Sequence, residues 1–456
     1  MAPESVDYHL EYHPVFNCPS NFLAFMLRRL DSRATDFDAE LAAVLSRQVR
    51  INHDVRDTVV QIVEDVRTNG DEALLRYTAL FDDFVVADAA MLEISSSDRE
   101  VALSELPSSL RQPLETAAVR IEEFHRHQKL SSWDYDDGQG SRLGQQVTPI
   151  EKVGIYVPGG KAAYPSSVLM SAIPAKIAGV KEIVMVAPSP NGVVNRIVLA
   201  ASHLAGVDRV FSIGGAQAVA ALGFGTATIP RVDKIVGPGN AYVTSAKQIL
   251  FGEVGIDMVA GPSEVVIIAD SGSNPEWLAM DLFAQAEHDE NAQSILLSPD
   301  HDLLDKVICS MHDLLPKMNR KEIIESSLVK NGAMIQVGSL ESAVDIANQI
   351  APEHLQLMVR DPTLLLDKVR NAGAIFCGYS TAEVFGDYCA GPNHVLPTAG
   401  TARFASPLGV YDFQKRSSVI WCSTSGASFL QETASVLAEC EGLLAHASSA
   451  MYRRTD

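Results

Sequence analysis

The segment Gln285-Ala286-Glu287-His288, near the end of a predicted helix, has the strongest chemical pattern in this chain of 456 residues. Positions i and i+3 share one helix face, so Gln285 and His288 can reach a common point while Glu287 points elsewhere. A neutral imidazole with carbonyl and carboxylate oxygens suits a borderline divalent ion such as zinc. The same tetrapeptide is also typical of a polar helix end with a hydrogen-bonded histidine.

A second pattern, Pro352-Glu353-His354, lies between a predicted helix and a predicted strand. Histidine titrates near neutrality and a dry cleft raises the pKa of a glutamate toward that range, so the pair could divide acid and base work. The alternative is an ordinary loop pair, because adjacent side chains often point in different directions. Asp387 and His394 lie in a glycine-rich segment, where ordered loops commonly carry function.

Glycine-rich turns follow several predicted strands, at Gly159-Gly160, Gly214-Gly215 and Gly237-Pro238-Gly239-Asn240. Glycine lets backbone amides approach a phosphate, and the following helix terminus favours its charge. None of the turns completes the pattern G-x-G-x-x-G, since Tyr242 stands where the third glycine of the last turn belongs. A standard Rossmann dinucleotide site is therefore not demonstrated, and tight turns of an α/β protein remain the alternative.

The elements that must position these residues alternate between strands and helices from Val153 onward. A first series is predicted over 153–157, 166–178, 182–186, 194–205, 209–213, 216–222, 234–236 and 241–250, and a second over 264–269, 275–288, 294–297, 303–315, 333–337 and 340–350. Such alternation indicates βαβ units around a parallel sheet. Two sheets, each with its own helices, are favoured over one continuous sheet.

The two ends of the chain are predicted to be helical. Apolar positions three and four apart predict helices over 41–49, 55–68, 71–81 and 111–129. A segment rich in Gly, Pro and Ser (391–424) precedes one amphipathic helix over 427–451, which is too short to bury its apolar face alone and must dock on something. Glu441 and His446 lie on this helix, where His446 would ordinarily belong to a solvated face.

Composition limits the class of protein. Hydrophobic residues make up 47% of the chain and charged residues 20%, and 57 acidic against 36 basic side chains give a net charge of −21. This balance disfavours binding to nucleic acid or to an anionic membrane surface. No secretory signal is visible at the start, and no window of about 18 apolar residues could span a membrane. Six scattered cysteines without a C-x-x-C pair favour reduced thiols in a cytoplasm.

Taken together, the ordered motifs resemble those of the histidinol dehydrogenase family, which makes the last two oxidations of histidine biosynthesis. The resemblance runs from about Val55 to the end of the terminal helix. The matching motifs are Val153 to Gly160, Gly214 to Ala218, Val232 to Asn240, Ala260 to Glu264, Gln285 to His288, Pro352 to Leu355, Gly391 to Thr398 and Asp412 to Arg416. Met1 to about Leu30 match nothing in this pattern, which leaves the role of the extension open.

The resemblance implies an α/β fold of two incomplete Rossmann-like, aldehyde dehydrogenase-like domains with helical N- and C-terminal segments, in a domain-swapped homodimer. It divides the chain into an N-terminal extension (1–30), a helical segment joining the second domain (31–150), a first domain on the NAD side (151–250), a second domain with the zinc and catalytic residues (251–390), and a loop with a helical tail exchanged between subunits (391–456). Exchange would give the terminal helix a partner to dock on.

The resemblance also implies the residues of the site. The zinc ligands would be Gln285, His288, Asp387 and His446, the acid/base pair Glu353 and His354, the further substrate contacts Ser263, His394 and Glu441, and the NAD contacts Tyr156, Gln217 and Asn240. The four zinc ligands and His354 would contact the substrate as well. The implied activity is the zinc-dependent oxidation of L-histidinol through L-histidinaldehyde to L-histidine, with NAD as the hydride acceptor.

Three other functions compete with this one. A relative could oxidise another small amino or sulfonate alcohol with the same chemistry, although Glu441 together with His394 favours histidinol. A cysteine-dependent aldehyde dehydrogenase would depend on Cys389, but no cysteine lies in a matched motif of the site. A zinc-dependent hydrolase would turn over without NAD.

Overall fold

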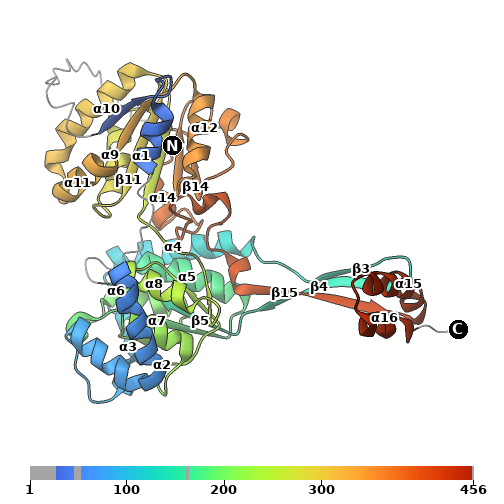
Figure 1. Ribbon diagram of the computed structural model, residues 1–456. Helices are drawn as coiled ribbons and strands as arrows, with labels where there is room; N and C mark the ends of the chain where they lie inside the picture. The colour runs from blue at the N-terminus through green and yellow to red at the C-terminus, as the bar shows by residue number, and fades with distance from the viewer. Residues whose placement is uncertain (1–26, 46–52, 160–163, 454–456) are drawn as a thin grey trace, which may run out of the picture. The chain divides into compact units, whose positions relative to one another are not determined.

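The computed structural model describes residues 27–45, 53–159 and 164–453 (Figure 1). The chain forms two compact units: the first holds Met1–Arg50, Val259–Gly386 and Leu396–Pro407, and the second holds Ile51–Met258, Asp387–Val395 and Leu408–Asp456. Most of the predicted extension 1–30, the end of the helix predicted over 41–49, and Gly160 of the first glycine turn lie outside the described residues.

The first unit is built on a six-stranded sheet of order β1-β12-β11-β10-β13-β14, in which every pair is parallel. Its strands are β1 (Arg28–Asp31), β10 (Glu264–Ala269), β11 (Gln293–Ser298), β12 (Ala333–Gln336), β13 (His354–Met358) and β14 (Ala374–Cys377). Its helices are α1 (Phe37–Leu45), α9 (Pro275–Ala286), α10 (His301–Leu314), α11 (Lys321–Asn331), α12 (Leu340–Ile350) and α13 (Thr363–Leu366). The short helix α14 (Glu383–Tyr388) carries the chain out of this unit.

The second unit has a similar six-stranded sheet of order β2-β7-β6-β5-β8-β9, in which β2 is antiparallel to β7 and the other pairs are parallel. Its strands are β2 (Glu93–Ile94), β5 (Lys152–Tyr156), β6 (Glu182–Val186), β7 (Arg209–Phe211), β8 (Lys234–Val236) and β9 (Gly255–Ile256). Its helices are α2 (His53–Asp82), α3 (Ser96–Ser104), α4 (Ser108–Arg126), α5 (Pro165–Ala178), α6 (Arg196–Leu204), α7 (Gly215–Phe224) and α8 (Ala241–Leu250). Here α2 belongs to the second unit, where it packs on α7 and α8.

Helices cover both faces of each sheet, because successive residues of the central strands are buried on opposite faces. In β10, Val265 and Ile267 pack toward α9, α10 and α11, whereas Val266 and Ile268 pack toward α1 and α12. This explains the continuous apolar runs in the sequence, which are typical of parallel strands. Among the described residues, no helix combines the length and the apolar character needed to cross a membrane.

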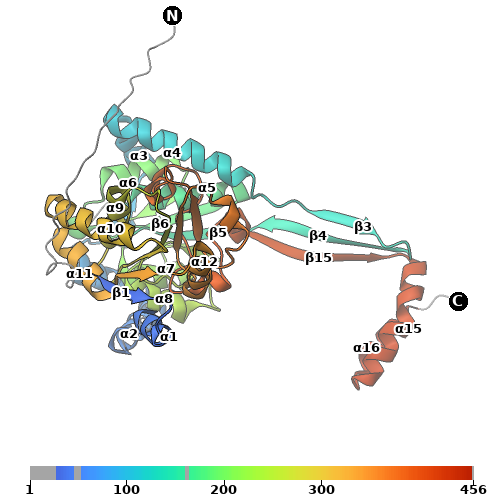
Figure 2. The ribbon, with the colours of Figure 1, turned by 90° about the horizontal axis from the view of Figure 1, so that it is seen from above.

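A third sheet, which the sequence patterns did not predict, belongs to the second unit. It is antiparallel, with the order β15-β4-β3, and consists of β3 (Trp133–Asp136), β4 (Ser141–Pro149) and β15 (Gln414–Cys422). Most residues of β3 and β15 are exposed, so the alternation of buried and polar positions that marks a half-buried strand is missing. Figures 1 and 2 show this ribbon with the two last helices at its far end.

The prediction of one terminal helix over 427–451 is wrong. The chain forms α15 (Thr424–Cys440) and α16 (Leu444–Met451), which pack against each other. The break lies at Gly442, whose φ of +74° is in the left-handed region that glycine adopts without steric cost. Glu441 and His446 therefore lie on opposite sides of a helix break and not on one continuous helix.

Candidate functional site

The acid/base pair lies at the amino edge of the first unit's sheet. Glu264 is the first residue of β10 and His354 is the first residue of β13, two neighbouring strands in parallel register. The backbone of Glu264 holds both candidates: its N–H donates to Glu353 Oε2 at 2.9 Å, and its carbonyl oxygen accepts from His354 Nδ1 at 3.0 Å. Since a carbonyl can only accept, Nδ1 carries the proton and Nε2 the lone pair.

The surroundings of His354 are acidic and buried. Glu353 and His354 are 7% and 3% exposed. His354 Nδ1 lies 3.7 Å from Glu353 Oε2 and 3.6 Å from Glu383 Oε1, so two carboxylates stabilise an imidazolium whenever the ring takes up a second proton. The ring of Phe376 on β14 lies 6.0 Å from the imidazole, centroid to centroid. His354 is therefore a base that can take up and release a proton in a largely dry environment.

Glu383 was not among the residues predicted from the sequence. It lies on α14, is buried, and accepts from the amide of Gln285 at 2.6 Å when this amide is oriented so that both of its polar atoms have partners. In the same orientation the Gln285 oxygen accepts from Glu264 N at 3.2 Å. An acidic residue on a short helix gives no periodic signal, but its spacing of one helical turn from Asp387 is visible in the sequence.

Three of these side chains form a candidate cation site. One ligand atom each of His354, Glu383 and Asp387 lies within 4.8 Å of the others, and Glu383 and Asp387 are one turn apart on the single helix α14. Of the four predicted zinc ligands, Asp387 belongs to this group, and Gln285 adjoins it through Glu383. His288 lies two residues beyond the end of α9, is exposed, and donates its backbone N–H to the carbonyl oxygen of Gln285.

Two further carboxyl groups of the first unit are held in their neutral form more easily than usual. Burial, with the negative charge of Glu353 as the second cause, raises the pKa of Glu264 to about 7. Burial also raises the pKa of Asp281 on α9 to about 6, although its Oδ2 accepts from Gln356 Nε2 at 3.2 Å. Ser263 directly precedes β10, and its carbonyl oxygen accepts from Gln293 N. Glu264 thus lies at the amino edge of this sheet, and Asp281 lies on α9 beside Gln356 of β13.

The three predicted NAD contacts lie at the carboxyl edge of the second unit's sheet. Tyr156 is the last residue of β5, Gln217 lies in the first turn of α7, and Asn240 is the N-cap of α8. The Tyr156 hydroxyl accepts from Gly215 N at 3.2 Å, and burial raises the pKa of this hydroxyl to about 12. Gln217 is 1% exposed, and within the part of the chain that the structure describes its amide has no hydrogen-bond partner.

His394 lies in a loop that α4 and α5 hold in the second unit. Its Nδ1 donates to the carbonyl oxygen of Asp387 at 2.8 Å, and its Nε2 lies 3.5 Å from the hydroxyl of Ser167. Arg120 on α4 donates to the carbonyl oxygens of Cys389 and Ala390. The loop between the predicted ligand Asp387 and the predicted substrate contact His394 is therefore fixed at its backbone.

The two predicted residues of the tail lie far along the chain from these groups. Glu441 caps the C-terminus of α15, and His446 lies in the first turn of α16. Both are exposed, as solvated helix residues are. Within the described residues, no hydrogen bond or ion pair is recorded between either of them and the residues of the two sheet edges.

Comparison with known proteins identifies the family. A family model described as histidinol dehydrogenase matches residues 45–454. Histidinol dehydrogenase of Pseudomonas savastanoi pv. phaseolicola is 56% identical over 430 residues, 94% of this chain and 96% of the relative, and that of Methylococcus capsulatus is 57% identical over 427 residues, 94% and 98%. The solved histidinol dehydrogenase from Elizabethkingia anophelis superposes with a TM-score of 0.89 at 36% identity, over 94% of this chain and 98% of that one. These matches confirm the resemblance and the α/β fold expected from it: the chain belongs to the histidinol dehydrogenase family of oxidoreductases.

Proposed function

We propose that the protein oxidises L-histidinol to L-histidine through L-histidinaldehyde, with two hydride transfers to NAD and with a zinc ion in the site. The observation that carries this proposal is the pairing of Glu353 and His354 on the backbone of Glu264. A base and a carboxylate held side by side by one residue can serve two successive oxidations of one carbon. Family membership supports the choice of substrate, and the geometry supports the proposed roles.

In the first oxidation His354 accepts the proton of the substrate alcohol at Nε2, while the carbinol hydrogen leaves as hydride to NAD. The hydrogen bond from Nδ1 to the Glu264 carbonyl oxygen sets this tautomer before the substrate arrives. The imidazolium that forms lies within 4 Å of carboxylate oxygens of Glu353 and Glu383. These charges offset the cost of burying a cation.

The second oxidation needs a hydrated aldehyde. Glu353 takes a proton from water as the water oxygen adds to the aldehyde carbon, and His354 returns a proton to the former carbonyl oxygen. The resulting gem-diol loses a proton to His354 and a hydride to a second NAD, which gives the carboxylic acid. One carboxylate oxygen of Glu353 accepts a hydrogen bond from Glu264 N, which orients the carboxyl group. The other oxygen accepts the proton of the water.

The residues present fit a divalent cation. Buried Glu383, half-buried Asp387 and His354 bring two carboxylates and an imidazole within 4.8 Å of one another. The amide of Gln285 donates to the carboxylate of Glu383. We propose Gln285, His288, Asp387 and His446 as the ligands, with Ser263, His394 and Glu441 around the substrate. Zinc, when bound, would supply a Lewis-acid template that orients the substrate's imidazole and amine. Glu383 would orient the amide of Gln285 as an outer partner of a ligand.

For NAD we propose the carboxyl edge of the second sheet, with Tyr156, Gln217 and Asn240 as contacts. Parallel sheets bind dinucleotides at this edge, where glycine turns lead into helices. Gln217 supports the proposal because a fully buried amide without a partner among the described residues is costly unless a ligand completes it. Asn240 accepts from Tyr242 N and Val243 N, so it fixes the start of α8.

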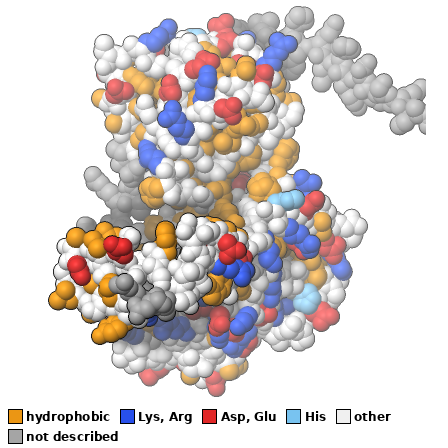
Figure 3. Space-filling view, turned by 90° about the vertical axis from the view of Figure 1, so that its right-hand side faces the viewer, with side chains coloured by type: hydrophobic (Ala, Val, Ile, Leu, Met, Phe, Trp, Pro, Cys, Tyr) orange, Lys and Arg blue, Asp and Glu red, His pale blue; other side chains and the backbone are white. Residues whose placement is uncertain are grey.

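We further propose a homodimer in which the tail completes the partner's site. Large apolar side chains are exposed along α15 and α16, and Figure 3 shows hydrophobic surface on these helices; they include Phe429, Leu430, Val436, Leu437 and Leu444. A second copy of the chain would cover this surface. Mixing inactive His446→Ala with inactive His354→Ala protein should then restore about a quarter of parental activity, because half of the exchanged dimers are mixed and each of these has one intact composite site.

The test of the function is a count of NADH formed from L-histidinol by zinc-loaded protein. Two NADH and one L-histidine per substrate are expected. Glu353→Gln should depress oxidation of L-histidinaldehyde more than oxidation of L-histidinol, since only hydration needs an activated water. One NADH per substrate, or turnover without NAD, would reject the proposed reaction, and equal loss of both steps in the variant would reject the role of Glu353.

A further inference from the structure

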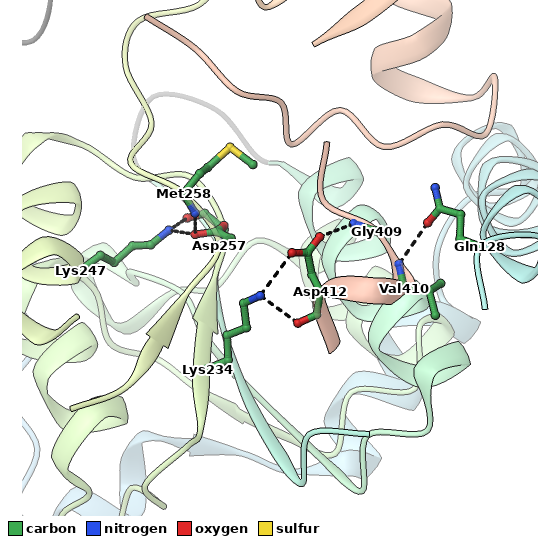
Figure 4. Close-up of polar contacts among 9 residues, drawn as sticks. Gln128, Lys234, Lys247, Asp257, Met258, Gly409, Val410 and Asp412 are labelled. Atoms are coloured by element: carbon green, nitrogen blue, oxygen red, sulfur yellow. Dashed lines mark hydrogen bonds and ion pairs between the residues drawn. The ribbon is translucent and has the colours of Figure 1, made fainter. Parts of the chain in front are cut away.

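The turn that leads into α8 is held by a buried ion pair. Lys247, near the end of α8, and Asp257, just after β9, have side chains that are 4% and 1% exposed and that contact each other directly (Figure 4). Lys247 Nζ also donates to the carbonyl oxygen of Gly237 at 2.9 Å, and Asp257 Oδ2 accepts from Gly237 N at 2.8 Å. One pair thus binds both backbone polar groups of one glycine.

Gly237 needs such a support. Its φ of +112° is open to glycine but not to other residues, and a Cβ at this position would overlap the carbonyl oxygen of Tyr156. The glycine directly follows β8 and is buried, so its N–H and C=O have to be satisfied inside the protein. Lys247 and Asp257 satisfy both groups while the glycine backbone lies against Tyr156.

We propose that Lys247 and Asp257 are positioning residues for NAD: they fix the turn from Gly237 to Asn240 at its first residue, as Asn240 fixes it at its last. This rests on the proposed binding of NAD at this edge. Asp257 is itself held in place, since its Oδ1 accepts from Met258 N at 2.6 Å and its N–H donates to the carbonyl oxygen of Ile235. Tyr156 and Asn240 are then kept in a fixed relation by a pair that does not itself contact the ligand.

A buried ion pair is a poor way to gain stability alone. Two well-packed apolar side chains in its place are often as stable, whereas removing one partner leaves a buried charge at high cost. The presence of the pair is explained when the two charges hold a backbone geometry that apolar side chains cannot hold. This separates a positioning role from a structural one, because the two roles predict different behaviour of a double variant.

The same unit offers a matched control. Lys234 on β8, three residues before Gly237, donates to the carbonyl oxygen of Asp412 at 2.8 Å and lies 3.4 Å from Asp412 Oδ1 (Figure 4). Its side chain is 13% exposed and that of Asp412 is 28% exposed. Lys234→Met therefore removes a lysine–aspartate pair from the same sheet and leaves both bonds to Gly237 intact.

The experiment compares Lys247→Met, the double variant Lys247→Met with Asp257→Leu, and Lys234→Met. Their dissociation constants for NAD, KM for L-histidinol, bound zinc and Tm are measured. Lys247→Met should raise the dissociation constant for NAD by about 10-fold, the effect of losing one charged hydrogen bond, and should lower the Tm. KM for L-histidinol and zinc content should stay within about 2-fold of the parent, since the first unit is untouched.

The double variant decides between the two roles. It should recover the Tm lost in Lys247→Met, because no buried charge is left, but it should keep the weak NAD binding. Parental NAD affinity in the double variant would overturn the positioning role, as would an equal loss of affinity in Lys234→Met. If the parent protein itself binds no NAD, the proposed function fails instead, so the two failures are distinct.

Discussion

The two six-stranded sheets share one strand order but carry their candidate functional residues at opposite edges. In the second unit Tyr156 is the last residue of β5, and Gln217 and Asn240 follow the carboxyl ends of β7 and β8. In the first unit Glu264 and His354 are the first residues of β10 and β13, the strands that correspond to β5 and β8. The second unit follows the rule that parallel sheets bind ligands at their carboxyl ends, and the first unit departs from it.

The two edges also differ in chemistry. The carboxyl edge of the second unit offers glycine turns, an amide and a tyrosine hydroxyl, and its buried charges, Lys247 and Asp257, neutralise each other. The amino edge of the first unit gathers Glu264, Glu353 and Glu383 around one histidine. The same strand order thus carries uncharged polar groups and a neutralised ion pair at one sheet and a cluster of acidic residues around a histidine at the other. The chemistry therefore depends on the residues placed on the fold.

The largest effect should come from His354. Replacing His354 with Asn keeps a polar side chain but removes the base, and we expect kcat to fall by about 10³-fold for both L-histidinol and L-histidinaldehyde. NAD affinity, measured by calorimetry, should stay at the parental value because the other edge is untouched. His301→Asn, an exposed histidine of the same unit, is the control. A parallel loss of NAD affinity would break the separation of the two edges.

Next in size is the effect of Glu383 on the metal. Glu383→Ala leaves the amide of Gln285 without its acceptor, and loss of such an outer partner typically costs about 10–100-fold in metal affinity. Competition with a chelator, read by metal analysis, measures this. Glu383→Gln keeps an oxygen that can accept from Gln285 and should lose less. Parental zinc affinity in Glu383→Ala would show that the cluster on α14 does not support the ligands.

At the carboxyl edge, Gln217→Ala should raise the dissociation constant for NAD by about 10-fold. The Tm should change by only a few degrees, because the amide lacks a partner among the described residues. Ser171→Ala is the matched control, since its hydroxyl is also fully buried in this unit and also lacks such a partner. If both variants bind NAD alike, Gln217 does not face the cofactor.

The two edges were not equally visible in the sequence. The strands and helices of both units follow from apolar runs and periodicity, and the glycine turns after β7 and β8 mark the carboxyl edge of the second unit. At the amino edge Glu353-His354 is equally consistent with an ordinary loop pair. Its partners Glu264 and Glu383 are brought to it by pairing of β10 with β13 and by the placement of α14, which no local pattern contains.

The tail shows a different limit. The amphipathic pattern of 427–451 predicts one helix, whereas the chain breaks after α15, where Gly442 has a positive φ. The exposed strands β3 and β15 lack a buried face and therefore lack a pattern. Elements that are stabilised by contacts outside their own unit, as we propose for this tail, leave little signal in their own sequence.

The smallest expected effect is a pH dependence of stability. It tests whether a carboxyl group of the first unit away from the amino edge, that of Asp281, also has a raised pKa. Burial raises the pKa of Asp281 to about 6, so the folded state binds a proton more tightly than the unfolded chain, where the pKa is near 3.8. The stability that this group contributes is complete below pH 4 and is lost as the pH rises through 6. At pH 8 the charged carboxylate costs the folded state about 3 kcal/mol. Asp281→Asn keeps an oxygen for the hydrogen bond from Gln356 and has no charge to bury, so its Tm should exceed that of the parent by a few degrees at pH 8. The difference should shrink at pH 5, where the parental carboxyl is mostly protonated. Thermal unfolding of the two proteins at both pH values, with zinc content matched, measures it, and a difference that does not depend on pH would show that Asp281 is ionised at little cost.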